Sequence, residues 1–398
     1  RRLAPAPRAT AGRADPTPGT ARAARDRRRG TVIKYLGSKR RLVPVLAQLA
    51  RRAGPRHATR ARRQRALDLF TGTTRVAQAF KADGAEVTAV DATRCAAALA
   101  RCYVATDRDD VDLAELEDAV AALNAVPGEP GYVTDTFCLR SRFFQPENGA
   151  RIDAVRHAIA RDHAGTPLEP VLLTSLLEAA DRVDSTTGVQ MAYVKQWSER
   201  SFRPLTLRAP ALLRGPGRAV RADACVVAGS LGTFDVAYLD PPYNQHRYDA
   251  NYHIWETIVA WDAPDHYGVA CKRADLRQGG RSVFNSRRTM PGALAQVVRD
   301  VPADVLVLSY NDESWIELDD LVEMCRARGH VEVLAFASAR YVGARIGIYN
   351  PSGERVGSVG RLHNLEYLLV AGDKDRVAHM VEPWPEASAA SLSGARGA

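Results

Sequence analysis

The chain has 398 residues, of which 46% are hydrophobic and 25% are charged, and this composition excludes a wholly disordered, collagen-like or coiled-coil protein. Its longest strongly apolar stretches, residues 305–308 and 365–370, are as long as strands and much too short to cross a membrane. Six cysteines are scattered without a CxxC pair or a tight Cys/His cluster, which argues against a zinc site and a disulfide framework. We therefore expect no membrane association and no metal ion. Because no secretory signal opens the sequence, we expect the protein in the reducing cytoplasm.

The net charge of +9 is distributed unevenly along the chain. Residues 1–65 contain 20 Lys or Arg and two Asp, whereas the remainder contains 35 basic and 44 acidic residues. A basic segment joined to an acidic body is typical of a protein that binds a polyanion such as nucleic acid. Only six of the 55 basic residues are Lys, however, and a bias toward Arg and Ala also follows from GC-rich codon usage. The charge pattern alone leaves both explanations open.

The amino-terminal quarter predicts a tail followed by the start of a parallel sheet. Residues 1–30 are rich in Arg, Ala and Pro and lack apolar periodicity, so we expect a disordered basic tail. A short apolar strand is predicted over residues 66–70, a helix over 75–82, a second strand over 86–90 and an Ala-rich helix over 93–104. Strand, helix and strand in this order are typical of a βαβ unit, the repeating element of parallel sheets.

Strand patterns nearly vanish in the middle of the chain and then return. Helices are predicted in the middle over residues 112–124, 150–162 and 168–183. Later strands are predicted over residues 234–239, 305–309, 331–336 and 365–370, with helices over 252–262 and 315–328.

The simplest fold for this order is an α/β sheet domain with a mostly helical insertion. Residues 31–104 and 220–372 would form the sheet domain, and residues 105–219 the insertion. Residues 373–398 are predicted to be a second disordered tail.

The first predicted strand leads into a glycine turn, Phe70-Thr71-Gly72-Thr73, ahead of a helix. In open α/β sheets such a turn lies at the carboxyl edge, where backbone amides and a helix N-terminus meet ligands. The turn is not GxGxxG, so the fingerprint of dinucleotide-binding dehydrogenases is absent. Asp91 closes the second strand, where such folds place a carboxylate that binds ribose hydroxyls. Many α/β domains have both features for structural reasons alone, so they indicate a ligand site only weakly.

The segment Asp240-Pro241-Pro242-Tyr243 directly follows the predicted strand over residues 234–239. Two prolines end the strand, fix the backbone and leave carbonyl groups without competing amides. The Asp240 carboxylate and the Pro241 carbonyl can then accept hydrogen bonds from one planar amino group, while the Tyr243 ring offers a stacking surface. Such a site suits the exocyclic amine of a nucleobase, because two acceptors favour a pyramidal nitrogen that can attack an electrophile. The alternative is that the prolines simply end a strand in a loop.

Taken in chain order, these motifs resemble those of the Dam-like class of adenine-specific DNA methyltransferases. Residues 34–40 are similar to the amino-terminal cofactor motif of that class, residues 68–72 to its glycine motif, and residues 240–243 to its catalytic motif. The stretches 248–256 and 308–311 are also similar to segments of the family. The resemblance implies a Rossmann-like methyltransferase sheet, S-adenosylmethionine as cofactor and double-stranded DNA as substrate.

The resemblance also implies a role for each matching position. The residues implied in cofactor binding are Tyr35, Lys39, Asp68, Phe70, Gly72, Asp91, Asp223 and Asp240. Of these, Asp91 would bind the ribose and Asp223 the adenine of the cofactor. The residues implied in holding the target base are Asp240, Pro241, Pro242 and Tyr243. The family usually has glycine where this chain has Thr74, and a Cβ there is expected near the methionine end of the cofactor.

The predicted activity is methyl transfer from S-adenosylmethionine to the N6 amino group of an adenine flipped out of DNA. Three alternatives stay open: methylation of adenine in RNA, methylation of the N4 amino group of cytosine, and a non-catalytic DNA-binding relic of the family. We expect a monomer, and the resemblance allows a restriction endonuclease partner.

The insertion is the predicted reader of the DNA sequence, because Arg is the usual reader of guanine in the major groove. Its candidate arginines are Arg140, Arg142, Arg151, Arg156, Arg200, Arg203 and Arg208. His253 and Trp255, by contrast, are expected to pack inside a helix rather than to take part in catalysis.

Overall fold

The computed structural model describes residues 33–34, 39–54, 62–194, 196–243, 247–278, 282–339, 348–349, 355–357 and 363–382. The chain from Ile33 onward belongs to one compact unit. The predicted tail over residues 1–30 lies outside the described residues.

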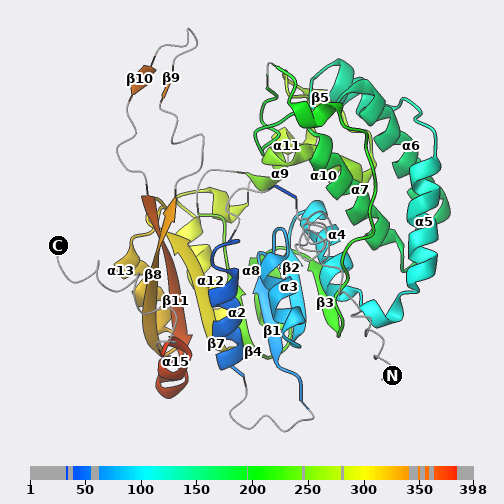
Figure 1. Cartoon of the computed structure of the whole chain (residues 1–398). Coiled ribbons are helices and arrows are strands. Elements are labelled where there is room, and N and C mark those ends of the chain that lie inside the picture. The colour runs from blue at the N-terminus through cyan, green and yellow to red at the C-terminus, as the bar shows by residue number, and fades with distance from the viewer. Residues whose placement is uncertain are drawn as a thin grey trace, which may run out of the picture. The chain divides into compact units, whose positions relative to one another are not determined.

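A seven-stranded sheet forms the centre of this unit (Figure 1). In spatial order its strands are β3 (Gly217–Arg221), β2 (Glu86–Asp91), β1 (Arg65–Leu69), β4 (Phe234–Leu239), β7 (Ala303–Asn311), β11 (His363–Gly372) and β8 (His330–Ala339). Neighbouring strands from β3 to β7 are parallel, and β11 runs antiparallel to both β7 and β8. The mostly parallel α/β sheet predicted from the sequence is therefore confirmed.

Side chains alternate along each strand and bury two opposite faces of the sheet. In β1, Leu67 and Leu69 point to one face and Ala66 to the other. The face of Leu67 is covered by α8 (Ala224–Val227), α12 (Met290–Asp300) and α13 (Leu318–Arg326). The face of Ala66 is covered by α2 (Val43–Arg52), α3 (Arg75–Ala82) and α15 (Lys374–Val381), and Figure 1 shows α2 and α3 in front of the strands.

Helix α15 corrects the prediction that residues 373–398 form a disordered tail. Asp373 caps the helix, because its side chain accepts a hydrogen bond from the Arg376 amide. Val377 and Met380 lie three residues apart on one face and are fully buried against the sheet. The remainder of that predicted tail, beyond residue 382, lies outside the described residues.

The insertion contains the three helices predicted for it. They are α5 (Leu113–Ala125), α6 (Pro146–Asp162) and α7 (Glu169–Val183). Their buried side chains share one core with those of α4 (Arg94–Ala100) and α10 (His253–Ala260). Figure 1 shows these helices gathered on the side of β3. None of the helices in the described part of the chain is long and apolar enough to cross a membrane.

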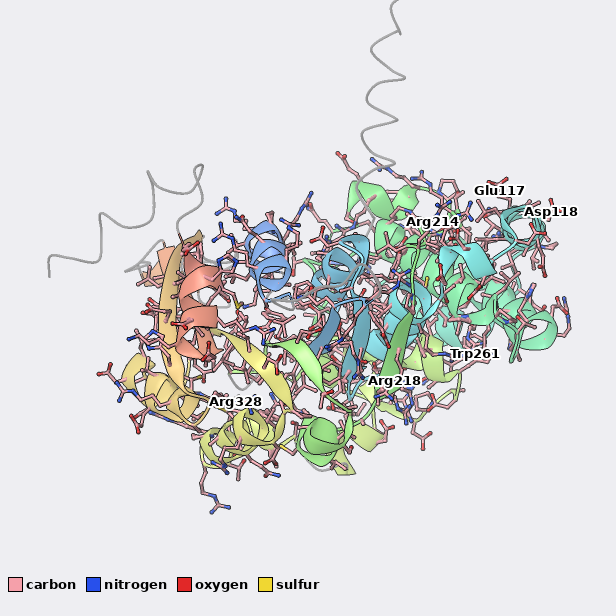
Figure 2. The ribbon with its side chains drawn as sticks, turned by 90° about the horizontal axis from the view of Figure 1, so that it is seen from below. Glu117, Asp118, Arg214, Arg218, Trp261 and Arg328 are labelled. Atoms are coloured by element: carbon pink, nitrogen blue, oxygen red, sulfur yellow. The ribbon has the colours of Figure 1, made fainter. Side chains whose placement is uncertain are left out.

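Figure 2 shows the same order from below. Arg328, which follows α13, lies on the side of β8, and Glu117 and Asp118 of α5 lie at the opposite end.

The remaining elements are short. The helical ones are the π-helices Arg101–Ala105 and Thr134–Leu139, α9 (Tyr248–Asn251), α11 (Asp275–Gln278) and the 3₁₀ turns Arg108–Asp110, Glu199–Phe202, Ala228–Ser230 and Val283–Asn285. The short strands are β5 (His266–Tyr267), β6 (Lys272–Arg273), β9 (Ile348–Tyr349) and β10 (Arg355–Gly357).

Candidate active site

A cavity lies where the connections of the sheet change direction. Strands β1 and β4 are neighbours, but the chain continues from β1 toward β2 and β3 on one side and from β4 toward β7 on the other. The carboxyl ends of two such strands leave a crevice that binds ligands in open α/β folds. The cavity at this edge has a volume of about 420 Å³, which is within the usual range for small-molecule sites.

The structure brings most of the predicted site residues together around this one cavity. Those that line it are Lys39, Asp68, Phe70, Gly72, Asp91, Asp223, Asp240, Pro242 and Tyr243. Pro241 is buried and is not among the lining residues. Tyr35 lies outside the described residues.

The glycine turn is held in an unusual backbone conformation. Phe70 and Thr74 have φ values of 75° and 62°, in the left-handed region, although neither is glycine. Side chains other than Gly, Asn and Asp rarely adopt this region, and strain of this kind clusters at functional sites. The turn brings the Gly72 amide to Asp91, whose Oδ2 accepts its hydrogen bond at 3.0 Å.

Thr74 stands where the family usually has glycine, and the resemblance implies that its Cβ lies near the cofactor. Its side chain is fully buried, and its Oγ1 accepts a hydrogen bond from Nε2 of Gln78 at 2.8 Å. It is absent from the residues that line the cavity, whereas its neighbours Thr73 and Arg75 line it. The cavity lining therefore gives no support to the expectation that a Cβ at this position lies near the methionine end of the cofactor.

Asp68, at the end of β1, is a buried carboxylate with an unused acceptor. Its Oδ2 accepts hydrogen bonds from Thr71 Oγ1 at 2.8 Å and from the Ala77 amide at 3.0 Å. Within the described residues, its Oδ1 has no hydrogen-bond partner. Burial raises the pKa of Asp68 to about 7. A buried oxygen of this kind needs a donor, and a cationic one would compensate its charge best.

Asp91 and Asp223 also line the cavity, and backbone amides fix both carboxylates. Asp91 Oδ1 accepts hydrogen bonds from the amide and the hydroxyl of Thr93, at 2.9 and 2.8 Å. Asp223 caps α8 by accepting a hydrogen bond from the Cys225 amide at 2.8 Å. A carboxylate oxygen has more than one lone pair, so each of these groups can still accept a bond from a ligand.

Asp240 follows β4 and faces a buried ammonium group. Nζ of Lys39 lies 3.2 Å from its Oδ1, and the same Nζ also contacts Oε1 of Glu366. Burial raises the pKa of Asp240 to about 6, although Lys39 opposes that shift. The Lys39 ammonium is also 5.5 Å from the centre of the Tyr243 ring, whose edge packs on Tyr310. Lys39 is thus an ion-pair partner of the catalytic motif as well as a lining residue of the cavity.

Sequence reasoning did not identify two glutamates at this site. Glu366 of β11 contacts Lys39 across more than 300 residues of sequence. Glu256 of α10 lines the cavity and accepts hydrogen bonds from the Arg94 and Cys95 amides at 3.0 and 2.8 Å, which caps α4. Both contacts depend on tertiary packing. The apolar sequence around Glu366 predicts a strand there, but it does not predict a contact with Lys39.

His253 and Trp255 have structural roles, as predicted. Nε2 of His253 is 3.0 Å from the Gln190 carbonyl oxygen, and burial lowers the pKa of the imidazole to about 4. Trp255 is buried and packs against Phe144.

Several of the candidate arginines for DNA reading instead hold the insertion together. Arg156 donates hydrogen bonds to the carbonyl oxygens of Ile258 and Val259 and lies over the ring of Trp261, which Figure 2 labels. Arg151 donates to two carbonyl oxygens near the end of α5. The candidates that remain exposed are Arg140, Arg203 and Arg208, and Arg142 is half-buried over the ring of Trp197.

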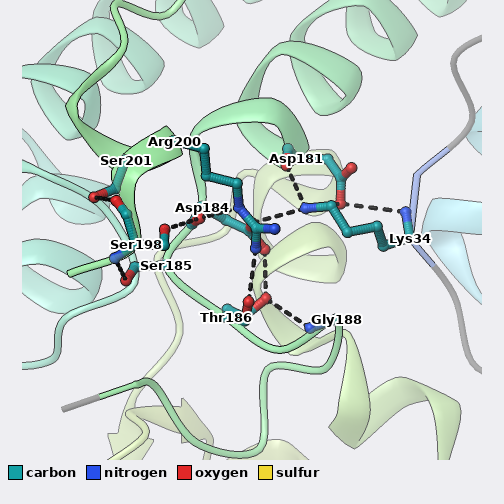
Figure 3. A network of polar contacts seen from close by, with 9 residues as sticks. All are labelled: Lys34, Asp181, Asp184, Ser185, Thr186, Gly188, Ser198, Arg200 and Ser201. Atoms are coloured by element: carbon teal, nitrogen blue, oxygen red, sulfur yellow. Dashed lines mark hydrogen bonds and ion pairs between the residues drawn. The ribbon is translucent and has the colours of Figure 1, made fainter. Parts of the chain in front are cut away.

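A polar network ties the amino-terminal motif to the insertion (Figure 3). Nζ of Lys34 donates to the Asp181 carbonyl oxygen at 2.7 Å and to Oδ1 of Asp184 at 2.9 Å. Arg200 donates to the Asp184 carbonyl oxygen and to the Thr186 carbonyl oxygen, at 2.6 and 2.7 Å, and also contacts the Asp184 carboxylate. Arg200 is therefore committed to this network rather than exposed for base reading.

In the described part of the chain, no group of three or more His, Cys, Asp or Glu side chains is arranged to hold a metal ion.

Comparison with known proteins agrees with this geometry. The sequence model of the D12 class N6 adenine-specific DNA methyltransferase family matches residues 35–324. The type II methyltransferase M.NlaIII of Neisseria lactamica is 30% identical over 285 residues, which cover 69% of this chain and 83% of that protein. The type II methyltransferase M.CviAII of Paramecium bursaria Chlorella virus 1 is 29% identical over 221 residues, covering 53% of this chain and 64% of the relative. The type II methyltransferase M.FokI of Planomicrobium okeanokoites is 26% identical over 194 residues, covering 47% of this chain and 29% of the relative.

These matches confirm the resemblance to adenine-specific DNA methyltransferases, and they favour DNA adenine over the RNA and cytosine alternatives. The family match and the named methyltransferases also favour an enzyme over a non-catalytic relic. The chain therefore belongs to the D12 class N6 adenine-specific DNA methyltransferase family, and its activity is the site-specific methylation of adenine in DNA.

Proposed function

We propose that the methyl donor is S-adenosylmethionine and that it meets the flipped adenine in the cavity at the carboxyl ends of β1 and β4. The observation that carries the proposal is that Asp68, Asp91 and Asp240 line the same cavity. Asp68 and Asp91 suit the amino group and the ribose of the cofactor, and Asp240 suits the target base. The cofactor, when bound, supplies an electrophilic methyl group.

The residues around the cavity fit the cofactor. The buried Oδ1 of Asp68, which lacks a donor among the described residues, suits the cationic amino group of the methionine moiety. Asp91 is held rigidly by the turn and by Thr93, and it suits the ribose hydroxyls. Asp223 also lines the cavity and suits the adenine amino group.

Asp240 and its neighbours would hold the target base. A base inside duplex DNA must leave the stack to reach this cavity, at a cost of a few kcal/mol. Stacking on the half-buried Tyr243 ring, worth about 1–3 kcal/mol per base, would offset part of that cost. The carboxylate of Asp240 and the carbonyl of Pro241 would accept the amino hydrogens and orient the nitrogen lone pair toward the methyl group. Rate enhancement would then come largely from positioning.

We extend the proposal to the recognition of the DNA sequence, the oligomeric state and the cellular location of the protein. The exposed Arg140, Arg203 and Arg208 are the arginines of the insertion that we propose as readers of the recognition sequence. We further propose a monomer, which light scattering would test, and a cytoplasmic location beside the DNA substrate. A restriction endonuclease with the same recognition sequence would be detected as cleavage of unmethylated DNA, and not of methylated DNA, by extracts of the source organism.

The experiment that tests the cofactor assignment compares two affinities in one variant. We expect Asp91→Ala to weaken S-adenosylmethionine binding, measured by calorimetry, by at least about tenfold, since one ribose contact to a charged group is lost. DNA binding by the same variant should stay within about twofold of the wild type. Equal losses in both affinities, or no loss in either, would contradict the placement of the cofactor.

A further inference from the structure

We propose that Glu366 is a positioning residue for the methylation reaction, which holds the Lys39 ammonium between two carboxylates and leaves Asp240 available to the target amine. The inference rests on the proposed role of Asp240 as the acceptor for that amine. Neither the sequence motifs nor the family match, which ends at residue 324, includes Glu366.

Glu366 lies behind the site rather than in it. It belongs to β11, and its register partner on β7 is Asn311, two residues beyond Ser309. The residue is only 8% exposed and is absent from the residues that line the cavity. A base or cofactor in the cavity would therefore touch Asp240 and Lys39 without touching Glu366.

The contacts of Glu366 are made to two fully or nearly buried groups. Its Oε1 contacts Nζ of Lys39, and the same oxygen accepts a hydrogen bond from Oγ of Ser309 at 3.3 Å. Lys39 is 8% exposed, and its Nζ lies 3.2 Å from Oδ1 of Asp240. Lys39 is thus shared between a carboxylate that faces the cavity and one that does not.

This arrangement leaves one negative charge in excess among three buried groups. Burying a second carboxylate beside Asp240 is costly, and a stability role alone would be met equally well by an uncharged side chain. The strength of Asp240 as an acceptor distinguishes a stability role of Glu366 from a positioning role. A carboxylate paired with an ammonium of its own is a weaker acceptor, whereas one that shares the ammonium keeps more of its negative charge for the ligand.

The charges around Asp240 come from every element packed against it. Lys39 approaches from the segment before α2 and Glu366 from β11. The other ionisable groups that act on it are Tyr238 on its own strand, Asp68 at the end of β1, Tyr243 and Tyr248. Glu366 raises the pKa of Asp240 and Lys39 lowers it, after burial, which raises it most.

The test is the pH dependence of methyl transfer by Glu366→Gln, which removes the charge and keeps the shape. Without the competing anion, Lys39 acts on Asp240 alone, so Asp240 ionises more easily. We expect the acidic limb of the rate profile to move to lower pH by about one unit. At pH 8 we expect kcat to fall about tenfold, the usual scale for losing a residue that orients a catalytic group, with the cofactor dissociation constant unchanged.

Two further variants separate this role from a merely structural one. Glu366→Asp retains the charge, so its acidic limb should stay at the wild-type pH even if its rate falls. Glu332→Gln is the matched control, since Glu332 lies on the neighbouring strand β8 and pairs with His330 away from the cavity, and it should behave as the wild type. If Glu366→Gln does not fold, Glu366→Leu removes the same charge with an apolar side chain and should show the same shift.

The inference is overturned if the acidic limb of Glu366→Gln overlays that of the wild type or moves to higher pH, or if Glu366→Asp shifts as far as Glu366→Gln. Failure of the underlying proposal has a different signature. An Asp240→Ala variant that keeps wild-type turnover would remove Asp240 as the acceptor, whatever Glu366 does, because alanine has no side-chain acceptor.

Discussion

Asp68 illustrates how burial of a single residue prepares the site for a cation. The carboxyl end of β1 carries it into the cavity, where two donors satisfy Oδ2 but no donor among the described residues satisfies Oδ1. Because burial disfavours the charged form, the pKa of Asp68 is raised to about 7, close to physiological pH. The protonation state of this one group should therefore control the affinity for a cationic ligand.

We predict that S-adenosylmethionine binding weakens as the pH falls through about 7, because the protonated Asp68 no longer attracts the amino group of the cofactor. Below that pH the dissociation constant should rise by up to about tenfold per pH unit. In Asp68→Asn the affinity should be low at every pH and nearly independent of pH. Calorimetric titrations from pH 5.5 to 8.5 measure both curves, and a flat wild-type curve would count against the assignment of Asp68.

Thr74 is a second residue whose conformation has a measurable cost. With φ at 62°, its β-branched side chain occupies a region that costs an L-residue about 1–2 kcal/mol. We predict that Thr74→Gly is about 1 kcal/mol more stable than Thr74→Ala, since both lose the side chain but only Gly relieves the backbone. Urea denaturation compares the two variants. Equal stability would mean that the turn relaxes, and cofactor affinity should change little in either variant because Thr74 does not line the cavity.

At the scale of elements, six of the seven strands of the sheet were predictable and the edge strand β3 was not. β1, β2, β4 and β7 are largely buried on both faces, so apolar side chains occur on both faces of each strand. β3 is an edge strand with one neighbour, and its sequence contains two Arg and a Gly, so the apolar pattern is missing. Helix α12 was not predicted, although the spacing of its buried residues Met290, Leu294 and Val297 is helical.

The site residues at the ends of the predicted strands were predictable, whereas those that reach the site by tertiary packing were not. Asp68 and Asp91 lie at the carboxyl ends of β1 and β2 and Asp240 directly follows β4, so the parallel sheet brings all three to one edge. Glu256 and Glu366 reach the site from a helix and from the antiparallel strand. Their positions depend on the packing of distant segments, which local sequence does not encode.

Helix α15 offers a test of the corrected boundary. Met380 is fully buried against the sheet, so Met380→Ala should lower the free energy of unfolding by about 2–5 kcal/mol. Lys374→Ala, at an exposed position of the same helix, is the control and should cost less than about 0.5 kcal/mol. Urea denaturation decides the matter, and a negligible loss for Met380→Ala would support the original prediction of a disordered tail.

At the scale of the whole molecule, the uneven charge suggests that residues 1–30 add nonspecific affinity for DNA. They carry nine Arg and two Asp. Each phosphate that a protein neutralises steepens the plot of log K against log salt by about 0.9. Deleting residues 1–30 should therefore weaken DNA binding chiefly at low salt, flatten that slope by a few units at most, and leave the methylated sequence unchanged. Binding isotherms at several salt concentrations check this, and an unchanged slope would assign the phosphate contacts to the rest of the chain.

If adenine in DNA is methylated in this cavity, Asp240 should be essential as the acceptor for the target amine. The most direct measurement is mass spectrometry of the bases in DNA from a methylation-deficient host that expresses either the wild type or Asp240→Ala. Because Asp240 lies beyond the end of β4 and lines the cavity, we expect the variant to remain folded, which circular dichroism verifies. We predict N6-methyladenine with the wild type and none above background with the folded variant. N4-methylcytosine in place of N6-methyladenine, no modified base with the wild type, or equal N6-methyladenine from the variant would contradict the account.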